Sequence, residues 1–158
     1  MASIHKVTGR LAALGPTINL RPTGGESNVI YEYLRFETSG SDERYFERVI
    51  VPSYLDSVLG FGAKGDFFVL TVPFPKMFGS SPVNVVFATS CEGKQRLAIP
   101  QAARCITGGN GGVALKLFMF GLIMMPAFGF GLIFWIWALR VMLVQVPMPE
   151  MQRVANER

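Results

Sequence analysis

The segment from residue 117 to residue 139 constrains this chain most, because it contains no charged residue along its whole length. A helix of that length reaches about 35 Å, enough to cross the roughly 30 Å hydrocarbon core of a bilayer. The core helix of a soluble protein would not normally stay apolar on every face for so long. We therefore predict a transmembrane helix over residues 113–146, with its membrane core at 117–139, rather than a buried core helix.

Charged and aromatic residues lie where this helix should meet the two membrane surfaces. Lys116 and Arg140 bracket the run, and Trp135 and Trp137 lie near its C-terminal end. Such side chains are expected at membrane–water interfaces. Lysine and arginine are balanced on the two sides, and the N-terminus lacks the apolar stretch of a signal peptide. We predict a single-pass protein of the cell (inner) membrane, with the N-terminal domain in the cytoplasm and a short polar tail, residues 147–158, outside.

Small residues and a proline interrupt the apolar run. Gly121, Pro126, Ala127 and Gly131 are candidates for helix–helix packing, because small side chains let another helix approach closely and proline favours a kink. An alternative is a turn at "MMPAFGFG", which would give a re-entrant hairpin that enters the membrane and returns.

A glycine-rich stretch, "TGGNGG" at residues 107–112, precedes the run. Six flexible residues reach about 13 Å root-mean-square. The sequence thus predicts a flexible linker over residues 106–112, which ties a domain of residues 1–105 loosely to its membrane anchor.

The N-terminal domain reads as short strands separated by turn residues. A helix of one or two turns is expected after Pro52, with Ser53 and Asp56 in a capping pattern and Gly60 at its end. The expected strands cover residues 6–14, 28–38, 44–51, 66–74, 83–90 and 95–100, and the last is expected to pair with the fifth.

The order of three strands, a helix and two more strands resembles the OB-fold, a five-stranded Greek-key barrel. The stretch "VIVPSYLDSVLGFGAKGDFFVLTV", residues 49–72, carries most of the resemblance, which covers residues 4–100. It implies a mainly β, five- to six-stranded OB-like barrel; an SH3-like barrel is the alternative. Membrane proteins of the nodulation-efficiency type also join an OB domain to transmembrane helices, although there the domain usually follows the helices.

Aromatic and basic residues on the second and third strands form a candidate ligand face. OB-folds that bind single-stranded nucleic acid stack bases on aromatic rings and hold phosphates with lysine or arginine. Tyrosines also favour strands for packing alone, and Glu32, Glu37 and Glu47 nearby would repel phosphate. The candidates are Tyr31, Tyr33, Arg35, Tyr45 and Arg48.

Residues 73–82, "PFPKMFGSSP", predict a long loop between the fourth and fifth strands. Its apolar residues Phe74, Met77 and Phe78 are candidates for contact with a protein or with the bilayer surface. The alternative is that they cap the end of the barrel.

Residues that would carry catalysis or hold a cofactor form no recognisable pattern. The chain has one histidine, and "GFGAKG" lacks the Lys-Ser/Thr ending of a phosphate-binding loop. Cys91 and Cys105 fit no metal motif and are expected to be ordinary thiols. We therefore expect no enzyme activity, cofactor or metal.

These features together predict a non-enzymatic membrane-anchored interaction or adaptor module, a small subunit of a larger membrane complex. Its expected partners are the lipid bilayer and other membrane proteins or copies of itself. The alternative is a membrane-tethered OB domain that binds single-stranded nucleic acid.

Overall fold

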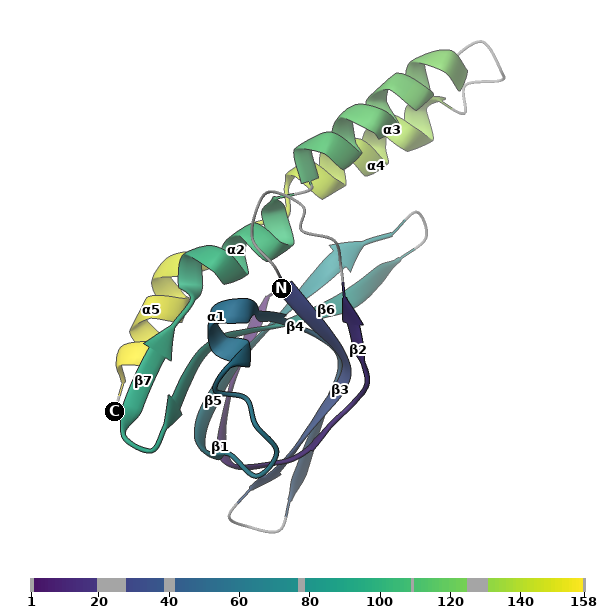
Figure 1. Ribbon diagram of the computed structural model, residues 1–158. Helices are drawn as coiled ribbons and strands as arrows, with labels where there is room; N and C mark the ends of the chain where they lie inside the picture. Colours follow the sequence, from purple (N-terminus) through teal and green to yellow (C-terminus); the bar gives the residue numbers. More distant parts are fainter. Residues whose placement is uncertain are drawn as a thin grey trace.

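A computed structural model describes residues 2–19, 28–38, 42–76, 79–108, 110–124 and 131–157, and the fold is mainly β (Figure 1). The elements in chain order are β1 (Ser3–Leu14), β2 (Thr17–Asn19), β3 (Asn28–Thr38), β4 (Glu43–Pro52), α1 (Ser53–Asp56), β5 (Lys64–Pro75), β6 (Ser80–Cys91), β7 (Lys94–Leu97), α2 (Ile99–Thr107), α3 (Asn110–Met124), α4 (Gly131–Met142) and α5 (Met148–Asn156).

Five strands close into a barrel in the order β1-β5-β6-β4-β3, with β3 pairing back onto β1. The β4–β6 pair is parallel and the other pairs are antiparallel. This arrangement, with α1 between β4 and β5, is compatible with an OB-like fold. The predicted mainly β class and barrel are therefore confirmed. So is the prediction that the strand after the fifth barrel strand pairs with it, since β7 pairs with β6. The short β2, which pairs with β3, was not predicted.

Gly9 allows β1 to close the barrel. It pairs with Gly65 of β5 on one side and with Thr38 of β3 on the other. A Cβ atom at Gly9 would lie 2.0 Å from the carbonyl oxygen of Glu37. Because that oxygen belongs to the backbone of the neighbouring strand, any side chain at position 9 would force β1 and β3 apart.

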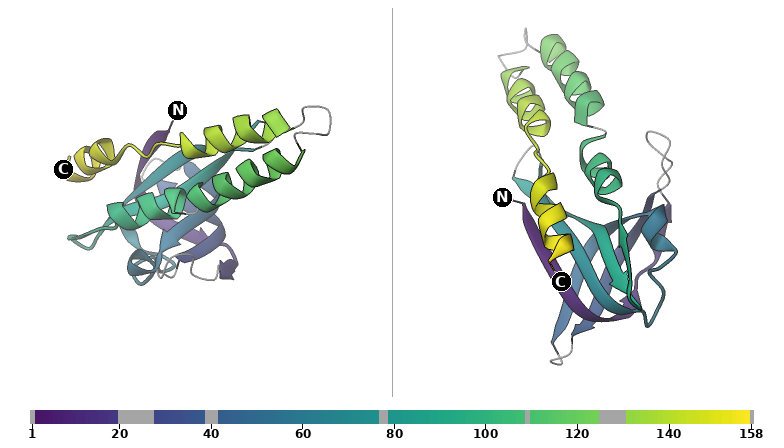
Figure 2. Two further views of the ribbon diagram at one scale, coloured as in Figure 1. Left: turned by 90° about the horizontal axis from the view of Figure 1, so that it is seen from above. Right: turned by 90° about the vertical axis from the view of Figure 1, so that its left-hand side faces the viewer.

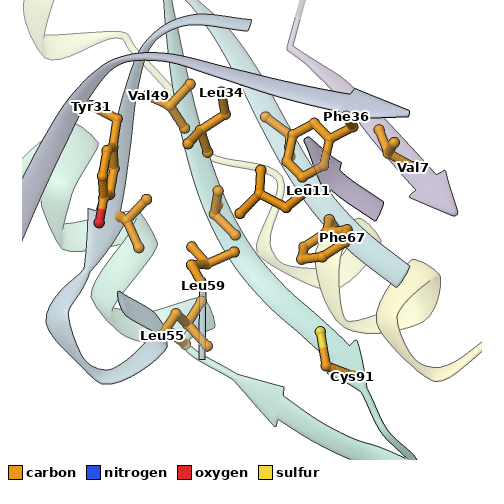
Figure 3. Close-up of a cluster of buried hydrophobic side chains, with 14 residues drawn as sticks. Val7, Leu11, Tyr31, Leu34, Phe36, Val49, Leu55, Leu59, Phe67 and Cys91 are labelled. Atoms are coloured by element: carbon orange, nitrogen blue, oxygen red, sulfur yellow. The ribbon is translucent and has the colours of Figure 1, made fainter. Parts of the chain in front are cut away.

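The barrel interior is packed with large apolar side chains, and the residues after β4 seal one end of it (Figure 3). Phe36 and Phe67 are fully buried, with ring centroids 4.8 Å apart. Leu55 of α1 and Leu59 just after it join the same cluster. The predicted cap of this helix is wrong: the N-cap residue is Pro52, no side chain caps the helix, and the Tyr31 hydroxyl donates to Asp56 Oδ1 at 2.6 Å.

The inward and outward alternation of β3 and β4 changes at a bend in the barrel. Tyr31 and Leu34 both belong to the interior cluster, although they are three positions apart. On the paired strand, Phe46 and Val49 show the same spacing, and Arg48 between them has a φ of 50°. A strand with strict two-residue alternation would put one member of each pair outside. The two strands therefore exchange faces together at this bend.

A second apolar core lies outside the barrel, where α2 and α5 cover one face of the sheet. Phe68 and Leu70 of β5 and Phe87 of β6 pack there with Ile106 of α2 and Met151 of α5. The figures show both helices along the same side of the barrel (Figures 1 and 2). Residues 147–158 are therefore not a free polar tail, because the amphipathic α5 buries its apolar side on the sheet.

The single helix predicted over residues 113–146 is wrong. Two helices, α3 and α4, run antiparallel and side by side, as the two views of Figure 2 and the ring contacts between them agree. The segment between them, which contains Pro126 and Ala127, lies outside the described residues. Gly121 lies against Gly131 and Trp135, so the absence of a side chain lets the helices approach closely.

The predicted flexible linker, residues 106–112, is mostly helical. Thr107 ends α2 and donates its hydroxyl to the Ala103 carbonyl, while Asn110 is buried and begins α3. Gly109 lies outside the described residues. Glycine disfavours a helix by about 1 kcal/mol per residue, and packing opposes that preference here, because Ile106 of α2 and Ala114 of α3 are both buried.

Candidate functional site

The hairpin formed by α3 and α4 exposes apolar side chains on all of its sides. A helix at the surface of a soluble protein normally turns a polar face to water, whereas the charged residues in this hairpin are Lys116 and Arg140 alone. Ile123, for example, is 69% exposed. The exposed apolar residues are Val113, Leu115, Phe118, Met119, Phe120, Leu122 and Ile123 on α3, and Leu132, Ile133, Ile136, Leu139 and Met142 on α4.

Aromatic pairs hold the two helices of the hairpin together. Phe118 stacks on Trp135 with ring centroids 5.2 Å apart, and Phe120 meets Phe134 edge to face at 4.9 Å. The Trp135 Nε1 also donates to the Phe118 carbonyl at 3.3 Å. The hairpin is thus a packed unit that projects away from the barrel (Figure 1).

The predicted interface residues mark different levels of the hairpin. Since Phe118 lies beside Trp135 and the helices are antiparallel, Lys116 lies at about the level of Trp137. Trp137 Nε1 donates to the Pro75 carbonyl of β5 at 3.3 Å, which joins the hairpin to the barrel at that level. Arg140, three residues further along α4, lies nearer the barrel.

A cavity of about 570 Å³ lies where the C-terminal end of α4 meets the barrel. Arg140 is the only charged residue among the described residues that line it, and Ser80 and Gln145 add uncharged polar side chains. Apolar residues that include Val72 and Val144 form the rest of the wall. Sequence reasoning placed Arg140 at a membrane interface but gave no signal for this cavity, because β5 and α4 are far apart in the chain.

Both ends of the hairpin return to the same face of the barrel. Before α3, Ile106 of α2 is buried in the outer core, and after α4, Met151 and Ala155 of α5 are buried in the same cluster. The Gln95 side-chain amide of β7 donates to the Ala155 carbonyl. Sequence analysis missed this docking, although Met151, Val154 and Ala155 have the spacing of one helix face.

One helical run among the described residues, Ile99–Ile123, is long and apolar enough to cross a membrane. It consists of α2 followed by α3. Because α2 packs on the barrel, only the α3 part of this run is available to a bilayer.

The predicted ligand face is only partly assembled. Tyr33 and Tyr45 stack on the outside of β3 and β4 with ring centroids 5.5 Å apart. Arg35 lies beside them and pairs with Glu43, with 3.7 Å between Nη1 and Oε2. Arg48 is exposed at the bend. Tyr31 is separate, because the change of alternation turns it into the barrel.

The predicted long loop at residues 73–82 is largely strand. β5 continues to Pro75 and β6 begins at Ser80, so these residues extend a β-hairpin. Phe74 is half-buried in β5 and pairs with Ser81. Met77 and Phe78 lie outside the described residues.

Neither cysteine forms a disulfide, and Cys91 is buried in the barrel core. Burial raises the pKa of the Cys91 thiol, with smaller contributions from the charges of Glu92 and Asp66. A raised pKa lowers the fraction of Cys91 that is present as the reactive thiolate. The described ranges contain no group of three or more histidine, cysteine, aspartate or glutamate side chains that could hold a metal ion.

Comparison with known proteins gives no relative from which to transfer a role. No protein family, curated protein or solved structure matches this chain.

Proposed function

We propose that this protein is a non-enzymatic, membrane-anchored adaptor whose α3–α4 hairpin inserts into one leaflet of the bilayer. The observation that carries the proposal is the projecting hairpin with apolar side chains exposed on all of its sides. A protein groove would need only one apolar face, whereas hydrocarbon surrounds an inserted hairpin completely.

The length of the hairpin supports insertion into a single leaflet. From the level of Lys116 and Trp137, where charge and indole favour the interface, α3 continues to Met124. That stretch rises about 12 Å at 1.5 Å per residue. One half of the hydrocarbon core is about 15 Å thick. The described part of the hairpin therefore suits one leaflet better than a full crossing.

The docking of α2 and α5 on the same face of the barrel favours the hairpin over a single-pass anchor. A single pass would place α5 across the membrane from the barrel, and Met151 would lose its buried site on β5 and β6. We propose instead that the barrel and α5 share one side of an inner membrane, with the cytoplasmic side expected.

Exposed aromatic residues on the barrel support a protein partner. Tyr54 and Phe61 are both more than half exposed. The Arg96 guanidinium lies over the Tyr54 ring at 5.6 Å, and that of Arg10 over Phe61 at 5.7 Å. Tyrosine, phenylalanine and arginine are enriched in protein interfaces. A membrane tether also raises the effective concentration of the barrel toward partners in the same membrane.

Labelling of engineered cysteines tests the anchor. Lys94→Cys on β7, which pairs with the barrel strand β6, and Gln152→Cys on α5 are at exposed positions, and the unmodified protein is the background control. In sealed vesicles that hold the full chain, we expect a membrane-impermeant maleimide to label both sites or neither. Labelling of one site only would support the single-pass arrangement and contradict the hairpin. Recovery of the protein in the supernatant of washed membranes would overturn the anchor itself.

Copurification in mild detergent tests the adaptor role. We expect a stoichiometric membrane protein, or a second copy of this chain, to be retained by the unmodified protein and lost from a Tyr54→Ala, Phe61→Ala variant. Retention of the same partner by both proteins would move the interface away from these aromatics.

The stacked pair Tyr33–Tyr45 is the observation that favours the alternative, binding of single-stranded nucleic acid. The adaptor is favoured because Arg35 is paired with Glu43, and Glu32 and Glu47 are exposed on the same strands. Salt-sensitive binding of an oligonucleotide, lost on Tyr33→Ala with Tyr45→Ala, would reverse this preference.

A further inference from the structure

The cavity between the barrel and the end of α4 has the chemistry of a lipid headgroup site. We propose that it binds the headgroup of an anionic phospholipid, with the phosphate against the Arg140 guanidinium. This inference rests on the proposed insertion of the hairpin into a bilayer and names a ligand at its base.

The charge of the cavity calls for an anion. Among the described residues of the lining, Arg140 is the only charged one, so none of them offers a carboxylate that would neutralise it. Among the described residues, no ion pair involves Arg140. A guanidinium binds phosphate through two parallel hydrogen bonds, which makes arginine well suited to this ligand. A zwitterionic headgroup would bring a second, cationic group, for which the described part of the lining offers no carboxylate.

The rest of the lining suits the ester and glycerol part of a lipid. The Ser80 hydroxyl and the Gln145 amide can hydrogen-bond to uncharged oxygens, while Val72, Pro73 and Val144 offer apolar contact. The volume of about 570 Å³ falls within the range of roughly 300–1,000 Å³ that is usual for small-molecule sites.

The position of the cavity matches the headgroup layer. Trp137, next to it on α4, donates to the Pro75 carbonyl, and Pro75 is itself part of the lining. Indole side chains prefer the membrane interface. Arg140 lies on the barrel side of Trp137, and most of the exposed apolar residues of the hairpin lie on the other side of Trp137. A lipid with its phosphate on Arg140 would therefore have its acyl chains beside the hairpin.

Lipid retention in the full chain tests the site. The protein is incorporated into vesicles of phosphatidylcholine with a minor fraction of phosphatidylglycerol, extracted in mild detergent, and its bound lipid is measured by native mass spectrometry. We expect one phosphatidylglycerol per chain, and retention at least about tenfold lower for Arg140→Gln, the factor equivalent to about 1.5 kcal/mol, the lower end for a hydrogen bond to a charged group. Arg140→Lys should keep part of it.

Two further variants separate a built site from general attraction. Lys76→Gln removes one exposed cation from the turn between β5 and β6, outside the cavity lining, and should retain the lipid. Ser80→Trp keeps Arg140 but fills the cavity with the indole ring, and this variant should lose the bound lipid. Equal loss in Lys76→Gln and Arg140→Gln, or retention in Ser80→Trp, would overturn the proposal.

Two controls keep this test apart from the anchor. Arg140→Gln should still insert into pure phosphatidylcholine vesicles, because the apolar hairpin is unchanged; if the parent protein fails to insert there, the anchor itself is wrong. Soluble glycerol phosphate should not displace the lipid at millimolar concentration. Displacement would make the ligand a free phosphate ester and overturn the lipid assignment.

Discussion

The barrel and the α3–α4 hairpin are both rich in aromatic and aliphatic residues, yet they place them oppositely. Phe36 and Phe67 of the barrel are fully buried, whereas Ile123 and Leu132 of the hairpin are more than half exposed. Most apolar residues of the barrel face its interior, and α2 and α5 cover the apolar outer face of β5 and β6, so this part of the molecule buries its apolar side chains within itself. The hairpin has no polar face, so it needs an apolar surrounding. The distribution of apolar residues around an element, rather than their number, therefore separates the two regions.

The α2–α5 pair stands between these two extremes. Each helix buries one side on the outer face of β5 and β6 and exposes the other, as Met151 and Met148 of α5 illustrate. These two helices connect a unit suited to water with a unit suited to hydrocarbon. The comparison therefore predicts three different responses to substitution, according to where the altered side chain lies.

The largest effect on membrane association is expected for a charge near the tip of the hairpin. Ile123→Asp should weaken membrane association by roughly 70- to 400-fold, because aspartate near the bilayer centre costs about 2.5 to 3.5 kcal/mol. Vesicle flotation measures this. Phe61→Asp on the barrel is a matched control, since Phe61 is 70% exposed and Ile123 is 69% exposed. Equal loss of association in both variants would show that exposure alone, and not the hairpin, governs membrane binding.

A truncation inside the barrel should lower stability without changing the preference for membrane. Phe36→Ala removes a fully buried ring and should lower the free energy of unfolding by about 3 to 5 kcal/mol. Leu139→Ala on the hairpin, 62% exposed, should change it by less than about 0.5 kcal/mol. Denaturant unfolding in detergent, followed by barrel circular dichroism, compares them. Similar losses in the two variants would mean that hairpin and barrel unfold as one unit.

Truncation on α5 should have an effect of intermediate size. Met151→Ala leaves a cavity in the outer core, because Met151 is fully buried, and should lower the free energy of unfolding by about 2 to 5 kcal/mol. The released α5 should then become sensitive to protease. Met148→Ala, at an exposed position of the same helix, is the control. If α5 stays resistant to protease in Met151→Ala, its docking on the barrel is not what protects it. The main argument that both ends of the hairpin lie on one side of the membrane would then be lost.

Local patterns allowed most of the barrel to be predicted. The strands from 28 to 38 and 83 to 90 are dense in β-branched and aromatic residues, and the helix after Pro52 fixed the order on which the OB-like resemblance rests. The same strand patterns gave a wrong prediction at the bend, because they assume strict two-residue alternation along the whole strand. Alternation put Tyr31 with Tyr33 on one face, and only the paired change near Arg48 turns Tyr31 inward.

The arrangement around the membrane segment was harder to predict, because it depends on contacts between distant residues. An uncharged run has no amphipathic phase, so length alone favoured one helix. The hairpin depends on pairs such as Phe118 with Trp135, and the cavity on Arg140 meeting β5. The glycines near residue 110 suggested a linker, although tertiary packing overrode their low helix propensity.

The smallest effect is expected at Tyr31, where one hydroxyl distinguishes an interior tyrosine from a phenylalanine. Tyr31 donates to Asp56 Oδ1 at 2.6 Å and so joins β3 to α1. Tyr31→Phe keeps the ring and should lower the free energy of unfolding by about 1.5 to 3 kcal/mol, the range for a hydrogen bond to a charged group.

The pH dependence of stability gives a sharper test of the same contact. Burial, followed by the hydrogen bond to Asp56 and the charge of that residue, raises the pKa of Tyr31 from 10.0 to about 12. The unfolded chain loses the phenol proton first, so the contribution is complete below pH 10 and is lost as the pH rises from 10 to about 12. Denaturant midpoints across that interval should fall more steeply in the parent than in Tyr31→Phe. Parallel profiles would mean that the Tyr31 hydroxyl lies in water. They would then also contradict the inward turn of β3 at this residue. The outer tyrosine Tyr45, for which the same change removes only an exposed hydroxyl, is the matched control, and Tyr45→Phe should follow the parent.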